Sequence, residues 1–215
     1  MNPFGVLAAA AAGWDEIRDR IADDERLRRL LGELRGAPAG SERRALAAES
    51  AARALARLVP ERFDGPSEGR WAGPATEVPV AGFAAVDLAV LLLDGHRMVG
   101  PVLGPVRDRL LAAESLTAEE LRRRGGTEDA AGLLRLPGPG GELRLPAFQF
   151  AADGAPWPEV VEVNALMDAA HDPWGAADWW LSPNAWLAGE LPARLVGGAS
   201  GGSLPAIARH LWEGD

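Results

Sequence analysis

Apolar residues recur every three or four positions in the N-terminal part of the chain, with Arg, Asp and Glu between them. This spacing predicts an amphipathic helix, or a pair of helices, over residues 15–34. A further helix is expected over residues 42–58, because Ser41 can cap its first turn and Pro60 follows its last. The sequence therefore predicts an N-terminal helical region over residues 1–59.

The helical pattern stops in residues 60–80, which hold four prolines and three glycines around Trp71. Proline and glycine end helices and favour loops, so we expect a linker here and place the domain boundary within it. Beyond the linker, residues 83–93 and 101–113 predict two more helices. The first of these is apolar on most of its faces, which predicts burial.

The sequence predicts that residues 81–150 form a helical region with a degenerate helix-turn-helix and a small β-hairpin. A helix over residues 118–124, capped by Ser115 or Thr117, is stopped by two glycines and followed by a second short helix over residues 128–133. Leucine-containing segments then flank Pro-Gly-Pro-Gly-Gly, which predicts a hairpin or wing.

DNA reading is the function that a helix-turn-helix first suggests. The exposed side of the second helix offers Glu128 and Asp129, whereas base edges are usually read by Arg, Asn, Gln or Ser. The candidate DNA contacts are Arg122, Arg123 and Arg124. Such a basic run is more often a solvated helix end that complements the helix dipole than a phosphate-binding site. A transcriptional regulator or scaffold protein that uses this degenerate motif is the alternative function.

The last part of the chain, residues 151–215, predicts a bundle of short helices broken by proline and glycine. Five of the eight tryptophans fall between Trp157 and Trp186. Large rings can build a small core, and tryptophan is also a common anchor of protein interfaces. The rings expected in the core are Trp157 and Trp174, and those expected to meet a partner are Trp179 or Trp180, Trp186 and Trp212.

Composition narrows the chemistry that this mainly α protein can perform. All 22 basic residues are arginine, which excludes a Schiff-base lysine and a P-loop lysine. The net charge of −9 argues against nonspecific nucleic-acid binding and suits a basic partner. Without cysteine there is no thiolate nucleophile, disulfide or sulfur-ligated metal, and a small protein without disulfides fits the cytoplasm. Residues 4–13 make a poor signal peptide and residues 82–93 are too short for a membrane span, so no membrane is expected.

Two patterns could suggest catalysis. Ser200 fits G-x-S-x-G, but no convincing strand precedes it and the residues after it, with His210, stand in the wrong order for a triad. His171 lies among carboxylates that lack metal-ligand spacing. These carboxylates are Glu159, Glu162, Asp172 and Asp178. We therefore expect a protein that is not an enzyme and holds no metal or cofactor.

Residues 115–215 carry several short motifs in order. They are P-A-F-Q-F at 146–150, D-G at 153–154, W-L-x-P-N at 180–184, L-x-G at 187–189, and then Pro192 and Leu195. In this order they resemble the antitoxins of the Xre/MbcA/ParS class, which carry a C-terminal toxin-binding domain. Residues 1–80 lie outside the resemblance.

This resemblance implies an intracellular antitoxin that binds a RES-domain toxin, an enzyme that consumes NAD, and covers the toxin's active-site cleft. It also implies a homo-oligomer in the complex, and operator DNA binding in some members, although the acidic, glycine-broken second helix departs from that pattern. Residues 204–212 are expected at or near the cleft, with residues 179–195 as the platform. The expected contacts are Trp179, Trp180, Pro183, Asn184, Trp186, Leu187, Leu191, Leu195, Leu204, Ile207, Leu211 and Trp212.

Overall fold

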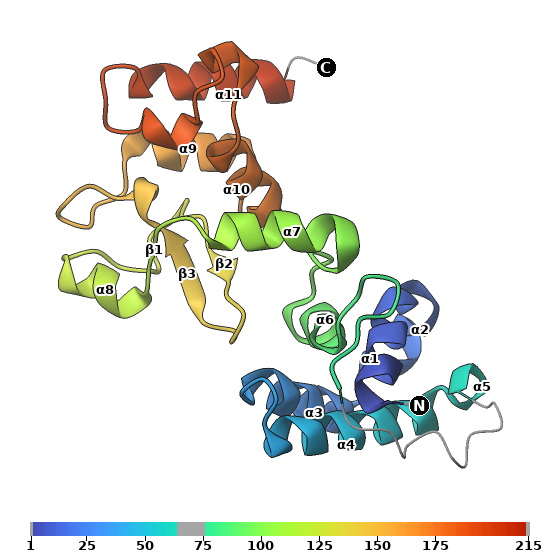
Figure 1. Ribbon diagram of the computed structural model, residues 1–215. Helices are drawn as coiled ribbons and strands as arrows, with labels where there is room; N and C mark the ends of the chain where they lie inside the picture. Colours follow the sequence, from blue (N-terminus) through green and yellow to red (C-terminus); the bar gives the residue numbers. More distant parts are fainter. Residues whose placement is uncertain (1, 64–75, 214–215) are drawn as a thin grey trace. The chain divides into compact units, whose positions relative to one another are not determined.

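The computed structural model describes residues 2–63 and 76–213, which form a mainly helical chain with one small three-stranded antiparallel sheet (Figure 1). The expected mainly α fold is confirmed. The chain divides into two units, and each is described by itself. Most of the expected linker, with Trp71, lies outside the described residues.

Side-chain caps set where the N-terminal helices begin. These helices are α1 (Pro3–Ala12), α2 (Trp14–Ile21), α3 (Glu25–Gly36), α4 (Glu42–Leu58) and the short α5 (Pro60–Phe63). Asp24 caps α3 by accepting the Leu27 N–H at 2.6 Å, and Ser41 caps α4 by accepting the Arg44 N–H at 3.2 Å. The helix pair expected over residues 15–34 and the helix expected at α4 are both confirmed.

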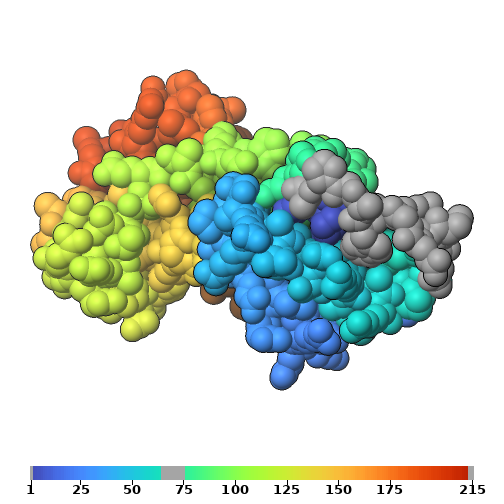
Figure 2. Space-filling view, turned by 60° about the horizontal axis from the view of Figure 1, so that its bottom comes forward, coloured from blue at the N-terminus to red at the C-terminus, as the bar shows by residue number. Residues whose placement is uncertain are grey.

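Leucines of α3 pack against alanines of α4 in the core of the first unit. The two helices lie side by side (Figures 1 and 2). Small alanine side chains let the helices approach closely, and the leucines fill the space between them. The fully buried side chains of this contact include Leu27, Leu31, Leu34, Ala48, Ala51, Ala52 and Leu55.

The apolar segment that was expected to be buried joins this N-terminal core. It forms α6 (Ala85–Ala89) and the π-helical η1 (Val90–Asp94), whose buried side chains belong to the same cluster as those of α1, α3 and α4. Arg35 of α3 pairs with Asp94 at 2.6 Å, and both side chains are largely buried. The burial expected for residues 83–93 is therefore confirmed.

Along the chain, the boundary between the two units falls between Pro105 and Val106, inside α7 (Gly100–Leu111). The sequence predicts this boundary in the linker at residues 60–80. The hydrophobic effect explains why the segment after the linker belongs to the first unit. A helix that is apolar on most of its faces is stable only inside a core, so residues 81–105 belong to the first unit.

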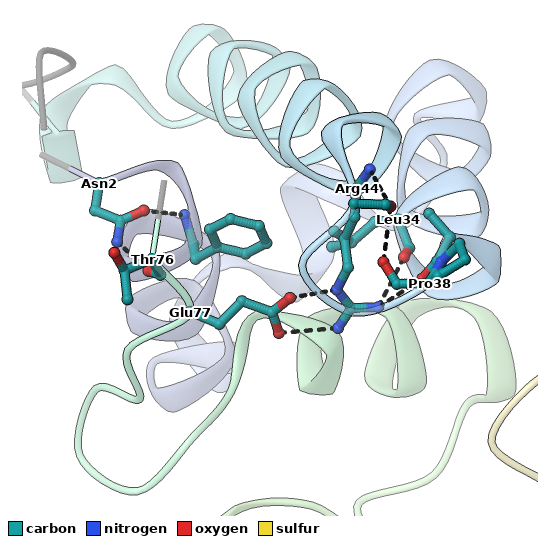
Figure 3. Close-up of polar contacts among 9 residues, drawn as sticks. Asn2, Leu34, Pro38, Arg44, Thr76 and Glu77 are labelled. Atoms are coloured by element: carbon teal, nitrogen blue, oxygen red, sulfur yellow. Dashed lines mark hydrogen bonds and ion pairs between the residues drawn. The ribbon is translucent and has the colours of Figure 1, made fainter. Parts of the chain in front are cut away.

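Arg44 ties the chain that enters α6 to the first unit (Figure 3). Its guanidinium donates to the Leu34 carbonyl oxygen at 3.1 Å and pairs with the carboxylate of Glu77. The side chain of Asn2, which caps α1, donates to the Thr76 carbonyl oxygen. Two polar side chains therefore fix this segment against α1 and α4.

The second unit is built on three short strands. They are β1 (Ser115–Leu116), β2 (Leu136–Pro137) and β3 (Leu143–Pro146), paired antiparallel in the order β1-β3-β2. β2 and β3 form the expected hairpin, with Leu136 opposite Arg144. α8 (Ala118–Arg123) contacts β3, and in Figure 2 it lies beside the hairpin. The Thr117 hydroxyl caps α8 by accepting the Glu120 N–H at 3.2 Å.

The second helix expected over residues 128–133 does not form, and turns occupy this segment. Gly132 adopts a left-handed φ of 74°. The backbone N–H and carbonyl oxygen of Leu134 are bonded to the side-chain amide of Gln149 at 2.6 and 3.0 Å, and a helix would need such groups for its own ladder. The helix-turn-helix prediction is therefore not confirmed.

Short helical elements complete the second unit, as expected. They are η2 (Ala147–Gln149), α9 (Pro158–Leu166), α10 (Pro173–Leu181), η3 (Ala185–Leu187), η4 (Pro192–Arg194), η5 (Gly201–Ser203) and α11 (Leu204–Glu213). α10 begins at Pro173, because Asp172 before it caps the helix by accepting the Gly175 N–H at 2.9 Å. α9 packs against α11. Within residues 2–63 and 76–213, no helix has the length and hydropathy needed to cross a membrane.

Candidate partner-binding surface

The residues expected to contact a partner divide into buried and exposed groups. Trp180 and Leu204 are fully buried. The half-buried members are Trp179, Asn184, Leu187, Leu191, Leu195 and Ile207. The exposed members are Pro183, Trp186, Leu211 and Trp212. The exposed group is the part of the set that can contact another molecule without rearrangement.

Trp180 is a core residue of the second unit. Its ring stands edge-on to Trp179, with centroids 4.9 Å apart, and lies 5.0 Å from the Phe148 ring. Phe148 belongs to the P-A-F-Q-F motif, so the motif supplies part of the core that holds α10. Trp174 is also buried, as expected, and Trp157 is half-buried. Burial removes Trp180 from the surface that a partner can reach.

A buried polar network fixes the position of Trp180. The indole Nε1 donates to Asn164 Oδ1 at 2.8 Å, and Asn164 Nδ2 donates to the Gly132 carbonyl oxygen at 2.7 Å. Asn164 also donates to Gln149 Oε1 at 3.4 Å. Because buried polar groups are stable only when they are bonded, these links lock α9, α10 and the segment before β2 together.

Sequence reasoning missed both amides of this network. In the sequence, Gln149 is one residue of the P-A-F-Q-F motif, and Asn164 follows several valines. Neither pattern by itself predicts a buried hydrogen bond. A signal is present in the helical spacing, because Asn164 lies one helical turn after Val160, and an amide on the apolar side of a helix must find a buried partner.

Arg109 of α7 holds the end of α10. Its guanidinium pairs with Asp178 and donates to the Leu181 carbonyl oxygen at 3.1 Å, while the Ser182 hydroxyl donates to Asp178 Oδ1 at 2.9 Å. A cation beside the last carbonyl groups also complements the helix dipole. No local pattern marks this contact in the sequence, because the partners lie far apart along the chain.

Asn184 closes the turn that carries Trp186. Its side-chain oxygen accepts the Trp186 N–H at 2.9 Å, and its carbonyl oxygen accepts the Gly189 N–H at 2.8 Å. Its own N–H donates to the Glu190 carbonyl oxygen at 3.1 Å. These bonds satisfy the backbone of a tight turn and leave the Trp186 side chain 62% exposed.

Trp186 lies next to α11. Its ring stands edge-on to His210, with centroids 4.9 Å apart. On the same helix, Leu211 is 37% exposed and Trp212 is 48% exposed. In the described part of the second unit, Trp186, Leu211 and Trp212 are the exposed large apolar side chains. We call these three side chains the indole face.

Two contacts hold α11 and the loop before it on α9. Leu204 and Ala208 are fully buried, and Arg209 pairs with Glu162 of α9 at 2.9 Å. Upstream, the Gly197 N–H donates to Glu159 Oε1 at 2.9 Å. α11 is thus anchored through its first turns, and its C-terminal end carries the exposed side chains.

The arginines considered for DNA binding lie at the end of α8. Arg122 is bonded to Glu128, which raises its pKa, and Arg123 approaches Glu119 at 3.9 Å. With the second helix replaced by turns, no recognition helix accompanies these arginines in the described residues. Their geometry is that of a helix end whose charges are partly neutralised.

The patterns considered for catalysis stay separate. His171 Nδ1 lies 2.7 Å from Asp168 Oδ1, and both side chains are exposed. This hydrogen bond raises the pKa of His171 above its ordinary value. Ser200 lies in the turn before η5, and its carbonyl oxygen accepts the Ser203 hydroxyl at 2.7 Å. Among the residues that the structure describes, no three His, Asp or Glu side chains are grouped as metal ligands would be.

The first unit contains a separate pocket of about 340 Å³. Its walls are mainly apolar and include the rings of Trp14 and Phe83. The charged residues that line it, Asp15 and Arg97, pair with each other. Their charges offset one another, so the pocket offers mainly an apolar surface.

Comparison of the chain with protein-family models, with curated proteins and with solved structures gave no match. The indole face and the motifs beneath it are therefore the basis for assigning a function.

Proposed function

We propose that this protein is an antitoxin that binds a RES-type, NAD-degrading toxin and covers the toxin's active-site cleft. The observation that carries the proposal is the indole face, where Trp186 is exposed on the turn that contacts His210, and Leu211 and Trp212 are exposed at the C-terminal end of α11. Tryptophan is a frequent hot-spot residue of interfaces, and grouped exposed apolar side chains mark interaction sites. The motifs that resemble the antitoxin class lie in the same unit.

The contacts beneath the indole face support a rigid docking module. Asn184 fixes the turn that carries Trp186, and the edge-on contact with His210 sets that turn beside α11. Behind them, the bonded pair Asn164 and Trp180 holds α9 and α10 together. A surface that is already ordered before binding loses less conformational entropy when the complex forms.

The roles that we propose for the expected contacts follow from their exposure. Leu204 stays in the core, so the C-terminal end of α11, with Leu211 and Trp212, is the part offered to the cleft. The turn with Trp186 forms the platform beside it. Half-buried leucines such as Leu187 and Leu191 would border the contact.

A DNA-binding regulator or scaffold is the less supported alternative. Turns replace the second helix, Arg122 is paired with Glu128, and the C-terminal surface is apolar rather than basic. Operator binding, if it occurs, would have to use a different surface from the expected one. A mobility shift with promoter DNA that weakens with salt would support this alternative.

Co-expression tests the proposal. The chain is produced together with the product of the neighbouring gene, which the proposal requires to be a RES-type toxin, and cellular NAD and growth are measured. We expect the full chain to preserve both. A chain truncated after Gly197, which lacks α11, should fail to protect, whereas Leu46→Ala, which removes an exposed apolar side chain of the first unit, should protect fully.

Two outcomes would contradict the proposal. Loss of NAD and growth despite full-length chain would refute neutralisation. Full protection by the truncated chain would refute the assignment of α11 to the cleft. Because truncation also removes the buried Leu204, Trp212→Ala provides a second variant that keeps the core.

A further inference from the structure

We infer that the partner surface which receives the indole face is bordered by cationic side chains, and that the acidic charge of the second unit steers the two proteins together. The inference rests on the proposed function and adds the chemistry of the surface that the partner must present. Glu190, in the turn that carries Trp186, is the residue to which we assign the contact with this cationic border.

Acidic charge is concentrated at the C-terminal end of the chain. Residues 151–215 contain nine Asp and Glu against two Arg, which accounts for most of the net charge of −9. One of those arginines, Arg209, is paired with Glu162. The C-terminal part of the second unit therefore carries net negative charge, and such charge raises association rates with positive partners.

Several of these carboxylates already have partners within the unit. Asp178 is paired with Arg109, and Asp172 accepts the Gly175 N–H as the cap of α10. Glu159 accepts the Gly197 N–H at 2.9 Å. Because these carboxylates are already bonded within the second unit, they are poor candidates for a direct contact with the partner.

Glu190 differs from them. It is exposed, and within residues 2–63 and 76–213 its carboxylate has neither a salt bridge nor a hydrogen bond. Its backbone is nevertheless fixed, because its N–H donates to the Leu187 carbonyl oxygen at 3.0 Å and its carbonyl oxygen accepts the Asn184 N–H. The turn therefore exposes the indole of Trp186 and the carboxylate of Glu190, and hydrogen bonds hold the backbone that carries both.

An apolar centre with a charged rim is the usual arrangement of a protein interface. Here the rings would be desolvated at the centre, and Glu190 would lie at the rim. The chemistry of the proposed partner agrees with this arrangement. NAD carries a pyrophosphate, so a cleft that binds NAD must offer positive groups or N–H donors to it. A carboxylate in the same turn as the exposed Trp186 indole suits the border of such a cleft.

Association kinetics test the inference. The full chain is mixed with the product of the neighbouring gene, the proposed RES-type toxin, and association and dissociation rate constants are measured between about 0.05 and 0.5 M NaCl. We expect the association rate constant to fall about tenfold or more over this range. Glu190→Arg should lower it several-fold at low salt, with a smaller effect on dissociation, and Glu190→Gln should fall between the two.

Asp129→Asn is the matched control, because Asp129 is an exposed acid in the turns that follow α8. Figure 1 shows α8 at the other end of the second unit from α11. It should leave both rate constants close to those of the unchanged chain. If a complex forms but its association is insensitive to salt and to Glu190→Arg, the inference is overturned and the proposed function stands. If the unchanged chain forms no complex at all, the proposed function is overturned and the inference with it.

Discussion

The indole Nε1 of Trp180 donates a 2.8 Å hydrogen bond to the side-chain oxygen of Asn164, in the core of the second unit. Asn164→Ala leaves the buried indole N–H and the Gly132 carbonyl oxygen without this partner. We expect the free energy of unfolding to fall by about 1–3 kcal/mol, the usual cost of an unsatisfied buried polar group. Urea denaturation followed by tryptophan fluorescence measures the change.

Glu162→Gln is the control for that substitution, because Glu162 is exposed on the same helix and forms a surface ion pair with Arg209. Its effect should stay within about 1 kcal/mol. An Asn164→Ala protein with an unchanged denaturation midpoint would show that the network does not hold α9 and α10 together.

Substitutions at Gly189 and Gly197, which both have a left-handed backbone, distinguish the cost of backbone strain from the cost of a steric clash. A Cβ at Gly197 would lie 2.6 Å from the Trp157 ring, whereas a Cβ at Gly189 would have no heavy atom within 4 Å. Their φ values are 69° and 86°. Gly189→Ala should cost about 1–2 kcal/mol from backbone strain alone, and Gly197→Ala should cost more. Thermal denaturation measures both, and equal costs would mean that Trp157 moves aside freely.

Asn184→Ala tests whether the turn must be ordered for binding. Removing a side-chain cap costs about 0.5–2 kcal/mol of local stability, and here the loss falls on the turn that carries Trp186. We expect faster dissociation from the toxin. Ser41→Ala removes a cap of the same kind from α4 in the first unit, so it should destabilise that unit and leave dissociation unchanged. Equal dissociation rates for the two variants would contradict the role of Asn184.

The pKa of His171 gives a pH-dependent prediction. The hydrogen bond to Asp168 raises this pKa above the ordinary value of 6.5, so protonated His171 favours the folded state. The contribution is present at pH values below 6.5 and is lost as the pH rises through the raised pKa. Asp168→Asn should bring the pKa of His171, measured by NMR titration, back towards its ordinary value.

Asp153→Asn is the control for the titration, because Asp153 has no contact with His171 and bonds the Ala155 N–H instead. The stability difference between the unchanged chain and Asp168→Asn should be greater at pH 5.5 than at pH 9. A titration of His171 that Asp168→Asn leaves in place would rule out this ion pair as the cause of the shift.

Local signals were enough to predict the elements whose ends are set by nearby residues. α4 has the predicted bounds because Ser41 caps it and Pro60 follows, and the hairpin follows from its Pro-Gly turn. The helix expected over residues 128–133 was wrong because a distant residue decides this segment. Gln149 bonds the backbone of Leu134, and no local pattern contains that contact.

The candidate site could be predicted as a region and not residue by residue. Adjacent tryptophans cannot be told apart by composition, and the structure buries Trp180 while Trp179 is half-buried. Trp186 and Trp212, which are expected to meet a partner, are exposed, and their contact with a partner stays a prediction. The closure of the Trp186 turn by Asn184, and the position of that turn beside His210, depend on packing that only the fold supplies.

The affinity between the chain and the proposed RES-type toxin, measured by isothermal titration calorimetry, tests the central claim most directly. Trp186 and Trp212 are replaced together by alanine, with Leu46→Ala as the control for loss of an exposed apolar side chain. Hot-spot residues each contribute about 2 kcal/mol or more, so we expect the double variant to raise the dissociation constant by about a thousandfold while the fold and the Leu46→Ala complex are unchanged. An unchanged dissociation constant for the double variant would contradict the assignment of the indole face as the toxin-binding surface.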